Sequence, residues 1–379
     1  MAKLNLVLAL PGLVLFICAA GCNREVDLSP DGKTVVTTNG NEVVFHDTTT
    51  KRPDIAVKLE GVGSPRFSPD SEFVAVGHGE VHGKSNGKKA GQVIRNSGTD
   101  VITKGGEVKF SVPGVYGPYA WRPDGSELAG TDEDGVAVIH IRSHQIVRHY
   151  PFAGNARQAA WLGTGRDLAF GTDDSLTVIH NGVAKQHALK GKLGGISFDT
   201  TQNRVIWVEI THQEGKDLLP RGEVAVRASD LQLAKTETLL EQSAFAELLA
   251  PNGRVGVPTN FAVSPDGSVL AVTGIVDASK SGLMDRYIAL GGFHKPGQLK
   301  KEVARKLGEI EKQLRFQVVC ATTPIGVSNP KATRRISSDI VDSKSNNPFW
   351  SDKVIWTDGG KSVAMLVNDN FVKKVSLQR

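Results

Sequence analysis

The stretch Leu28-Ser29-Pro30-Asp31-Gly32, which leads into the apolar run Thr34-Val35-Val36, decides the fold of this chain because it recurs. Each copy has a hydrophobic or aromatic residue, a turn, and then a run of small apolar residues. The further copies are Phe67-Ser68-Pro69-Asp70-Ser71, Trp121-Arg122-Pro123-Asp124-Gly125, Trp161-Leu162-Gly163-Thr164-Gly165, Phe198-Asp199-Thr200-Thr201-Gln202, Val263-Ser264-Pro265-Asp266-Gly267 and Trp356-Thr357-Asp358-Gly359-Gly360. A repeated unit defines the architecture before any single residue is interpreted.

The chemistry of the turn explains the repeated phrase. Proline presets φ at the second position of a type I turn, aspartate suits the next position, and glycine accepts the left-handed conformation that closes the turn. The residues on either side then form two antiparallel strands. The copies around Gly163, Thr200 and Asp358 lack the Pro-Asp pair, so they rest on position and flanking pattern, and the copy at Thr200 is the most degenerate.

The spacing of the copies predicts the size of the repeating unit. From Pro30 to Pro69 is 39 residues, from Pro123 to Gly163 is 40, and from Gly163 to Thr200 is 37. These intervals match the roughly 40–45 residues of a four-stranded propeller blade. The longer intervals, such as the 93 residues from Pro265 to Asp358, indicate blades with insertions or one additional blade.

The third and fourth copies show a complete unit. After the turn at Pro123, three strands are expected at Leu128–Gly130, Val136–His140 and Gln145–Arg148, with a polar turn at Asp132–Gly135. Four short strands cannot bury both faces of their own sheet, so such units stack around an axis. We therefore predict an all-β chain that forms a single β-propeller over residues 22–379, with seven four-stranded blades and bounds of six and eight.

With this turn phrase the sequence resembles the WD-repeat and TolB-type β-propellers, which share a Ser-Pro-Asp-Gly-Lys turn. The resemblance covers nearly all of residues 25–379 and implies the fold, because such propellers serve many functions. It does not imply TolB itself, which carries a separate domain ahead of its propeller. The Trp-Asp pair of WD repeats is also replaced, by His46-Asp47, His140-Ile141 and His180-Asn181.

The first residues are typical of a targeting segment rather than of the fold. Lys3 is followed by an apolar stretch that ends in Ala19-Ala20-Gly21-Cys22. This segment resembles a bacterial lipoprotein signal, which implies cleavage after Gly21 and lipid attachment, such as palmitate, at Cys22. A plain secretory signal or an uncleaved anchor helix are the alternatives. Asn23 resembles an outer-membrane sorting signal, so we expect a lipid-anchored protein of the bacterial cell or outer membrane that faces the periplasm.

One insertion has the pattern of an amphipathic helix, at about residues 298–314. Its apolar face consists of Leu299, Val303, Leu307, Ile310 and Leu314, spaced at three or four residues. A shorter helix is expected within Leu239–Ala250. Both are expected to pack on the propeller itself, and the longer one could instead cover a funnel mouth or bind a partner.

Several groups of residues invite a reading as metal or catalytic sites. His78-Gly79-Glu80-Val81-His82 contains two histidines, but we interpret it as a blade loop because the spacing is not that of a helical zinc motif. His46, His140 and His180 lie at equivalent positions of different blades, too far apart to share one ion. Asp132-Glu133-Asp134-Gly135 lacks the rest of a calcium loop. Cys320 is expected to be a buried, inert thiol.

Composition and motifs limit the classes of function that this chain can have. The 379 residues contain 45 Lys and Arg and 40 Asp and Glu, a net charge of +5 that does not indicate nucleic-acid binding. Neither a nucleophile elbow nor a phosphate-binding loop is present, so no catalytic residue and no cofactor is predicted. We expect a non-catalytic scaffold for an envelope protein. The alternatives are a propeller that binds a small molecule or glycan, and a propeller lyase or hydrolase.

Overall fold

The structure, a computed structural model, describes residues 25–50, 53–83, 92–151, 156–163, 165–213, 221–249, 258–279, 282–290, 301–325, 334–337, 341–342, 352–367 and 370–376. Most of these residues lie in seven antiparallel sheets, which we call blades 1 to 7. Blade 1 holds β1 (Glu25–Leu28), β2 (Thr34–Thr38), β3 (Glu42–Asp47) and β4 (Ile55–Lys58). Blade 2 holds β5 (Gly63–Phe67), β6 (Phe73–Gly83), β7 (Gln92–Thr103) and β8 (Val108–Pro113). Blade 3 holds β9 (Tyr116–Trp121), β10 (Glu127–Thr131), β11 (Gly135–His140) and β12 (Gln145–Pro151).

The remaining blades follow in chain order. Blade 4 holds β13 (Gln158–Trp161), β14 (Leu168–Gly171), β15 (Ser175–His180) and β16 (Val183–Ala188), and blade 5 holds β17 (Lys192–Asp199), β18 (Arg204–Gln213), β19 (Arg221–Asp230) and β20 (Thr236–Leu240). Blade 6 holds β21 (Pro258–Val263), β22 (Val269–Asp277), β23 (Arg315–Pro324), β24 (Arg334–Ser337) and β25 (Val341–Asp342), and blade 7 holds β26 (Asp352–Thr357), β27 (Ser362–Val367) and β28 (Asn370–Ser376).

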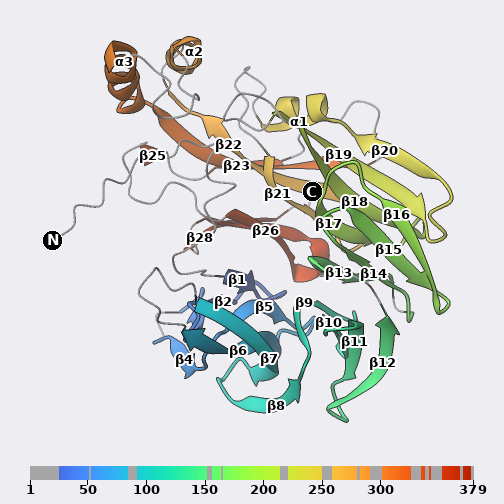
Figure 1. Ribbon diagram of the computed structural model, residues 1–379. Helices are drawn as coiled ribbons and strands as arrows, with labels where there is room; N and C mark the ends of the chain where they lie inside the picture. Colours follow the sequence, from blue (N-terminus) through green and yellow to red (C-terminus); the bar gives the residue numbers. More distant parts are fainter. Residues whose placement is uncertain are drawn as a thin grey trace.

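The first strand of each blade is its inner strand, and these strands contact one another in succession from β1 through β5, β9, β13, β17 and β21 to β26. The blades follow one another around a ring (Figure 1). The protein is therefore a single β-propeller. The expectation of four strands in every blade needs correction, because six blades have four strands or more while blade 7 has three among the described residues. In its described part, the interval between the last two turns holds β23, β24, β25 and helices rather than an eighth sheet.

Among the described residues, the ring closes by side-chain packing rather than by a shared strand. The described strands of blade 1 come from residues 25–58 and those of blade 7 from residues 352–376, so neither sheet includes a described strand of the other. Val26, Leu28 and Val35 of blade 1 pack with Ala364 and Leu366 of blade 7 in a small buried cluster. The backbone N–H of Asp358 also donates to the carbonyl of Pro30 at 2.8 Å.

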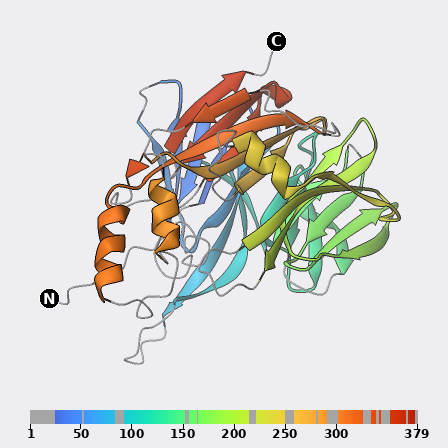
Figure 2. The same cartoon turned by 90° about the horizontal axis from the view of Figure 1, so that it is seen from above.

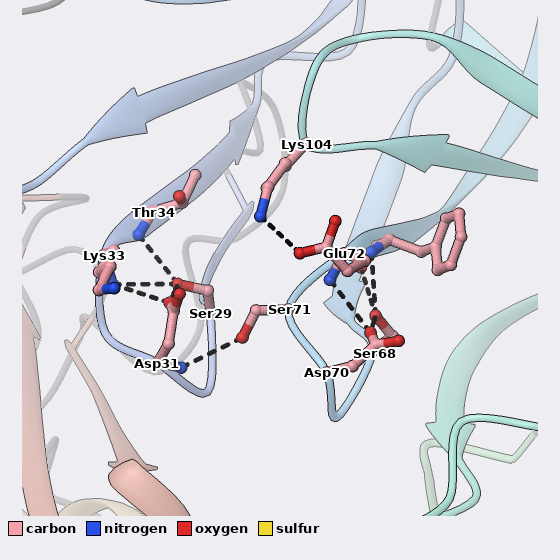
Figure 3. A network of polar contacts seen from close by, with 10 residues as sticks. Ser29, Asp31, Lys33, Thr34, Ser68, Asp70, Ser71, Glu72 and Lys104 are labelled. Carbon is pink, nitrogen blue, oxygen red and sulfur yellow. Dashed lines mark hydrogen bonds and ion pairs between the residues drawn. The ribbon is translucent and has the colours of Figure 1, made fainter.

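Each Pro-Asp turn is held by its own aspartate. In the first turn, Ser29 Oγ donates to Asp31 Oδ1 at 2.6 Å, and the same carboxylate oxygen accepts from the Lys33 backbone at 3.0 Å (Figure 3). Gly32 adopts φ +70° to close the turn. In the second copy Ser71 takes the glycine position at φ +65°, and its hydroxyl accepts from the Asp31 backbone at 3.2 Å. That bond joins the turns of blades 1 and 2.

In blades 3, 4 and 7, the tryptophan before the turn fastens the blade to the preceding one. Trp161 Nε1 donates to the Ala120 carbonyl at 2.8 Å, and Trp121 Nε1 donates to the Arg66 carbonyl at 3.0 Å. Trp356 makes the same contact with Ala262 at 3.1 Å. In each case the acceptor lies one residue before the corresponding aromatic or apolar position of the neighbouring blade. The repeat is therefore a unit of packing between blades as well as of turn geometry.

Two helices were predicted, one at about residues 298–314 and a shorter one within Leu239–Ala250, and the described residues hold three α-helices. They are α1 (Gln242–Leu249), α2 (Leu283–Ala289) and α3 (Lys301–Glu311). α3 falls within the expected range 298–314 and buries Leu307 and Ile310, with Leu314 buried just beyond its end. These residues join a core that includes Tyr287 of α2 and strands of blades 6 and 7. Leu299 lies outside the described residues.

The two faces of the propeller differ. We call the face with the Pro-Asp turns the lower face and the face where the inner strands begin the upper face. Because the second and third strands of a blade join at the upper face, long hairpins there rise above the ring. Strands β6 and β7, β18 and β19, and β22 and β23 form such hairpins, and α2 and α3 follow β22. α2 and α3 lie side by side beyond the ends of β22 and β23 (Figures 1 and 2).

The amino-terminal segment, including Gly21 and Cys22, lies outside the described residues. Within the described part of the chain, no helix has both the length and the apolar character that crossing a bilayer requires.

Replacing Trp161 tests whether the aromatic residue fastens blade 4 to blade 3. Trp161→Phe removes the hydrogen bond to Ala120 but keeps most of the packing, so we expect a loss of about 1 kcal/mol of unfolding free energy. Trp161→Ala also opens a cavity and should cost about 3–5 kcal/mol. Urea unfolding measures both. The control Val183→Ala, at an exposed position of β16, should stay within about 0.5 kcal/mol. A Trp161→Phe variant as stable as the natural protein would contradict the role of the indole N–H.

Candidate functional site

Polar side chains recur at one position of the inner strands, three residues before the aromatic or apolar residue of the turn phrase. Ser64, Gln158 and Asn260 occupy it in blades 2, 4 and 6, and Glu25 and Lys353 occupy it in blades 1 and 7. All five are partly buried. Blade 5 has Gly195 there, and a Cβ at that glycine would stand 3.8 Å from Gln158 Oε1. Five of the seven inner strands thus carry a polar side chain at this position, whereas blade 3 has Pro118 and blade 5 has a glycine.

Four charged residues of blades 1, 2 and 7 form the axial ion cluster, defined as Glu25, Asp27, Arg66 and Lys353. Asp27 Oδ1 lies 3.7 Å from Arg66 Nη1 and 3.4 Å from Lys353 Nζ, and its side chain is 4% exposed. Asp27 Oδ2 accepts from the Phe67 backbone at 2.9 Å. Lys353 Nζ also donates to the Val26 carbonyl at 2.6 Å. Asp27 thus receives donors and cations from the blades on both of its sides.

The partners of this cluster indicate what it can do. Glu25 accepts from the Ser64 backbone of blade 2, as Asp27 accepts from Phe67 of the same blade. These contacts tie both carboxylates to the backbone of blade 2, and Asp27 also faces two cations. The cluster joins blades 1, 2 and 7 and complements the apolar contact that closes the ring. Arg66 remains half exposed, so it is the group of this cluster with most access to solvent.

No group of three or more His, Cys, Asp or Glu side chains is arranged to hold a metal ion within the described part of the chain. His46 contacts Asp54 at 2.9 Å, His140 contacts Ser143 at 3.0 Å, and His180 contacts Asp167 at 2.8 Å. Each of these histidines has a partner within its own blade, and the structure does not bring the three together.

The segment His78–His82 was interpreted as a loop, and that interpretation is wrong. It belongs to β6, which pairs with β7 beyond the level of the inner strand. His78 Nδ1 lies 3.1 Å from Asp100 Oδ2, and Ser111 Oγ donates to Asp100 Oδ1. Asp100 thus stands between the serine and the histidine. In a catalytic triad the histidine must lie between the other two, so this arrangement cannot activate Ser111 as a nucleophile.

Two further predictions concern single elements. Asp132 Oδ1 accepts from the backbone of Asp134 at 3.0 Å and of Gly135 at 2.7 Å, so the acidic stretch is a hairpin turn stabilised by its first aspartate. Cys320 lies on β23 and is 1% exposed. Its burial agrees with the prediction.

A second buried charge cluster lies between blades 3 and 4. Glu127 Oε2 accepts from Arg148 Nη2 at 2.5 Å and from Arg122 Nη1 at 3.2 Å. Both guanidinium groups lie over the Trp161 ring, at 5.9 and 5.8 Å from its centroid. Burial by itself raises the pKa of Glu127, but the hydrogen bonds and charges of Arg148 and Arg122 outweigh burial and hold this pKa below its ordinary value. Glu127 therefore stays ionised and fixes both arginines on the indole.

A polar cavity of about 220 Å³ lies away from the axis, at the lower end of blade 5. Its lining includes Arg204, Ser229, Asp230, Lys235 and Glu237. Arg204 already pairs with Asp199 at 2.9 Å and with Glu237. The charges of the lining thus balance one another.

Comparisons with known proteins find similar solved structures at low sequence identity. No protein-family model and no curated protein matches the sequence. Among solved structures, hydrazine synthase from Kuenenia stuttgartiensis is similar, with a TM-score of 0.52 at 16% identity over 93% of this chain and 94% of that chain. The β-propeller domain of Cps50 (Swd1) from Myceliophteria thermophila has a TM-score of 0.45 at 10% identity, covering 84% of this chain and 87% of that chain.

A putative TolB from Agrobacterium tumefaciens is also similar, with a TM-score of 0.37 at 16% identity over 57% of this chain and 80% of that chain. At such identities a likeness concerns the fold alone. The assignment of a propeller rests on the order of the sheets and on the contacts between the inner strands.

The axial ion cluster was not predicted from the sequence. Glu25 and Asp27 precede the first turn at alternate positions of β1, and Arg66 directly precedes Phe67. Alternation of two acids on an inner strand is the signal that could have found them, because alternate residues of a strand share one side. Lys353 lies far away in the sequence, so its contact depends on closure of the ring.

Replacing Asp27 tests the axial ion cluster. Asp27→Asn keeps an oxygen for the Phe67 N–H but removes the charge that Arg66 and Lys353 face. We expect a loss of about 1–3 kcal/mol of unfolding free energy, below the usual value for a buried pair because both cations reach solvent. In a double-mutant cycle with Lys353→Met, measured by urea unfolding, the two losses should be less than additive. The control Lys104→Met breaks an exposed pair with Glu72 and should cost less than about 1 kcal/mol.

Glu127 should make stability depend on pH. Its folded-state pKa is lowered from the ordinary 4.5, so its contribution is present above that value and is lost as pH falls through the lowered pKa. The unfolding free energy of Glu127→Gln should therefore lie below that of the natural protein at pH 7, and the difference should shrink on acidification below about pH 4.5. Chemical unfolding across pH 3–7 measures this. A difference that stays constant over this range would show that Glu127 acts only through its shape.

Proposed function

We propose that this protein is a lipid-anchored bacterial envelope protein whose propeller acts as a binding scaffold for another envelope protein. One observation carries this proposal: three charged groups of the inner strands, Glu25, Asp27 and Lys353, are engaged in contacts between blades. Asp27 and Glu25 accept backbone N–H groups of blade 2, and Lys353 donates to the Val26 carbonyl. A catalytic funnel would need acids and bases that are free to face a substrate.

The loops and turns of the two faces are then the surfaces available for binding. The blades are joined by inter-blade indole hydrogen bonds and buried ion clusters, so the ring presents these loops on a rigid frame. Function on loops that a rigid scaffold positions is a common arrangement. We count the three-stranded sheet of β26, β27 and β28 as the seventh blade of this frame, with blade 1 as its neighbour.

The anchor is proposed from the sequence pattern that ends in Gly21 and Cys22. Cleavage after Gly21 would leave Cys22 as the first residue, and its fatty acids would hold the propeller to the cell or outer membrane from the periplasmic side. Stable anchoring requires more than one acyl chain, as lipid on a modified amino-terminal cysteine provides.

A second candidate function is binding of a small polar ligand or glycan at the axis. The observation that favours it is the set of partly buried Ser64, Gln158 and Asn260 at equivalent positions of the inner strands. Hydroxyl and amide groups donate and accept hydrogen bonds and would suit such a ligand.

The anchor predicts a specific result for Cys22→Ala. The natural protein should incorporate radiolabelled palmitate and sediment with membranes, whereas Cys22→Ala should take up no label and stay unprocessed by a lipoprotein-specific peptidase. Label in the alanine variant, or a natural protein without label, would contradict lipidation at Cys22.

Binding of a partner is tested by reciprocal affinity capture from detergent-solubilised membranes. Deleting α3 is unsuitable, because Leu307 and Ile310 belong to the core. Two double variants that reverse exposed charges are used instead. Lys33→Glu with Arg142→Glu changes the lower face, and Lys301→Glu with Arg305→Glu changes the upper face. One envelope protein that is captured in both directions and lost with one double variant supports the scaffold. Absence of any stoichiometric partner of the natural protein would contradict it.

A further inference from the structure

The propeller chain begins on the upper face. β1 starts at Glu25, and Glu25 accepts from the backbone of Ser64 near the start of the neighbouring inner strand β5. From Glu25 the strand runs to Leu28 and into the Pro-Asp turn of the lower face. Whatever precedes Glu25 in the sequence therefore leaves the propeller from the upper face, beside the axis.

The upper face also carries the parts that rise above the ring. In blade 2 the inner strand begins opposite Gly77, and β6 continues to Gly83, which adds up to about 20 Å at the rise of a strand. In blade 5 the inner strand begins opposite Ile210, and β18 continues to Gln213, which adds up to about 10 Å. In Figure 2, α2 and α3 lie toward the same side of the molecule as the outer ends of β6 and β7.

Blade 6 contributes the largest of these projections. Its inner strand begins opposite Gly274, β22 continues to Asp277, and α2 and α3 are placed beyond that strand. The pair of helices is part of the fold rather than a loose insertion. Leu283, Tyr287, Leu307 and Ile310 are buried together, and Tyr287 Oη donates to Glu311 Oε1 at 2.7 Å.

The tether is shorter than these projections. Three residue steps separate Cys22 from Glu25, and they span at most about 10 Å when fully extended. A bilayer that holds the fatty acids of Cys22 would therefore lie as close to the ring as the ends of the blade 5 and blade 6 strands, and closer than the end of β6. The tether therefore leaves no gap between the projections and the bilayer, so the projections would contact the bilayer surface.

We propose that the upper face of the propeller stands against the lipid surface, with the projections of blades 2, 5 and 6 in contact with lipid headgroups. This orientation rests on the anchor proposed above. It leaves the lower face, with its Pro-Asp turns, directed away from the membrane and open to the partner.

The exposed side of α3 suits headgroups rather than the acyl interior. Its buried side is already used in the core, and its exposed residues are charged. Arg305 pairs with Glu309 at 2.6 Å, and Lys306 pairs with Glu302 at 3.1 Å. Because charges of both signs alternate there, the helix would lie on zwitterionic or mixed headgroups without strong attraction to anionic lipid. The lipid anchor, not the charge of the helix, would supply the affinity.

The chain offers a clean test with single thiol probes. Cys22 is consumed by lipidation, and Cys320 is 1% exposed, so an introduced surface cysteine can be labelled alone. Arg305→Cys places a fluorophore on the upper face, and Arg142→Cys is the matched control on the lower face, since both residues are exposed arginines. The natural lipidated protein should take up almost no fluorophore. The labelled proteins are reconstituted in vesicles of phosphatidylethanolamine and phosphatidylglycerol that contain headgroup-spin-labelled lipid.

We expect the spin-labelled headgroups to quench the probe at position 305 at least threefold more than the probe at position 142. Raising the salt concentration should change this ratio little. A flexible Gly-Ser insertion of about 20 residues between Arg24 and Glu25 should lower the quenching at position 305, because it releases the short tether.

Each other outcome overturns the inference in a distinguishable way. Equal or reversed quenching in a protein whose fatty acid is verified by mass spectrometry rejects the orientation and leaves the anchor intact. The same result would follow if the upper face bound a protein partner and stood away from the bilayer. A protein that carries no fatty acid on Cys22 rejects the anchor and the orientation together.

Discussion

Packing of each blade against its two neighbours is the constraint on which the whole structure depends. A four-stranded sheet of five or six residues per strand has two apolar faces and no layer of its own to cover them. The buried clusters accordingly run between blades: residues of β10 and β11 join Trp161 of blade 4, and residues of blade 5 join those of blade 6. The same constraint explains why indole N–H groups reach across to the preceding blade, since an aromatic residue buried there needs a partner for its polar edge.

Much of this architecture could be predicted from the sequence, and particular residues show why. The turns at Pro30, Pro69, Pro123 and Pro265 are local chemistry, and local chemistry can be read from the chain. Even the copy at Asp358 forms its turn, with Gly359 and Gly360 at positive φ. The polar turn at Asp132 is of the same kind.

What could not be predicted depends on long-range contacts or on insertions. The contact between Asp27 and Lys353 exists only because the first and last blades meet. The strand at His78–His82 was taken for a loop because its glycines and histidines resemble loop composition, whereas pairing with β7 extends the hairpin there. Blade 7 was expected to have four strands, and α2 was not expected at all, because the long interval before the last copy carries no repeat.

The closure between blades 1 and 7 has a consequence for how the chain matures. Since the described strands of the two end blades are not shared, the apolar side of blade 1 that meets Ala364 and Leu366 stays uncovered until the last blade has been synthesised. A nascent chain would therefore expose this surface until synthesis of blade 7 is complete. A ring that closes this late would need protection by a chaperone during that interval. Chains that stop short of blade 7 would be degraded rapidly.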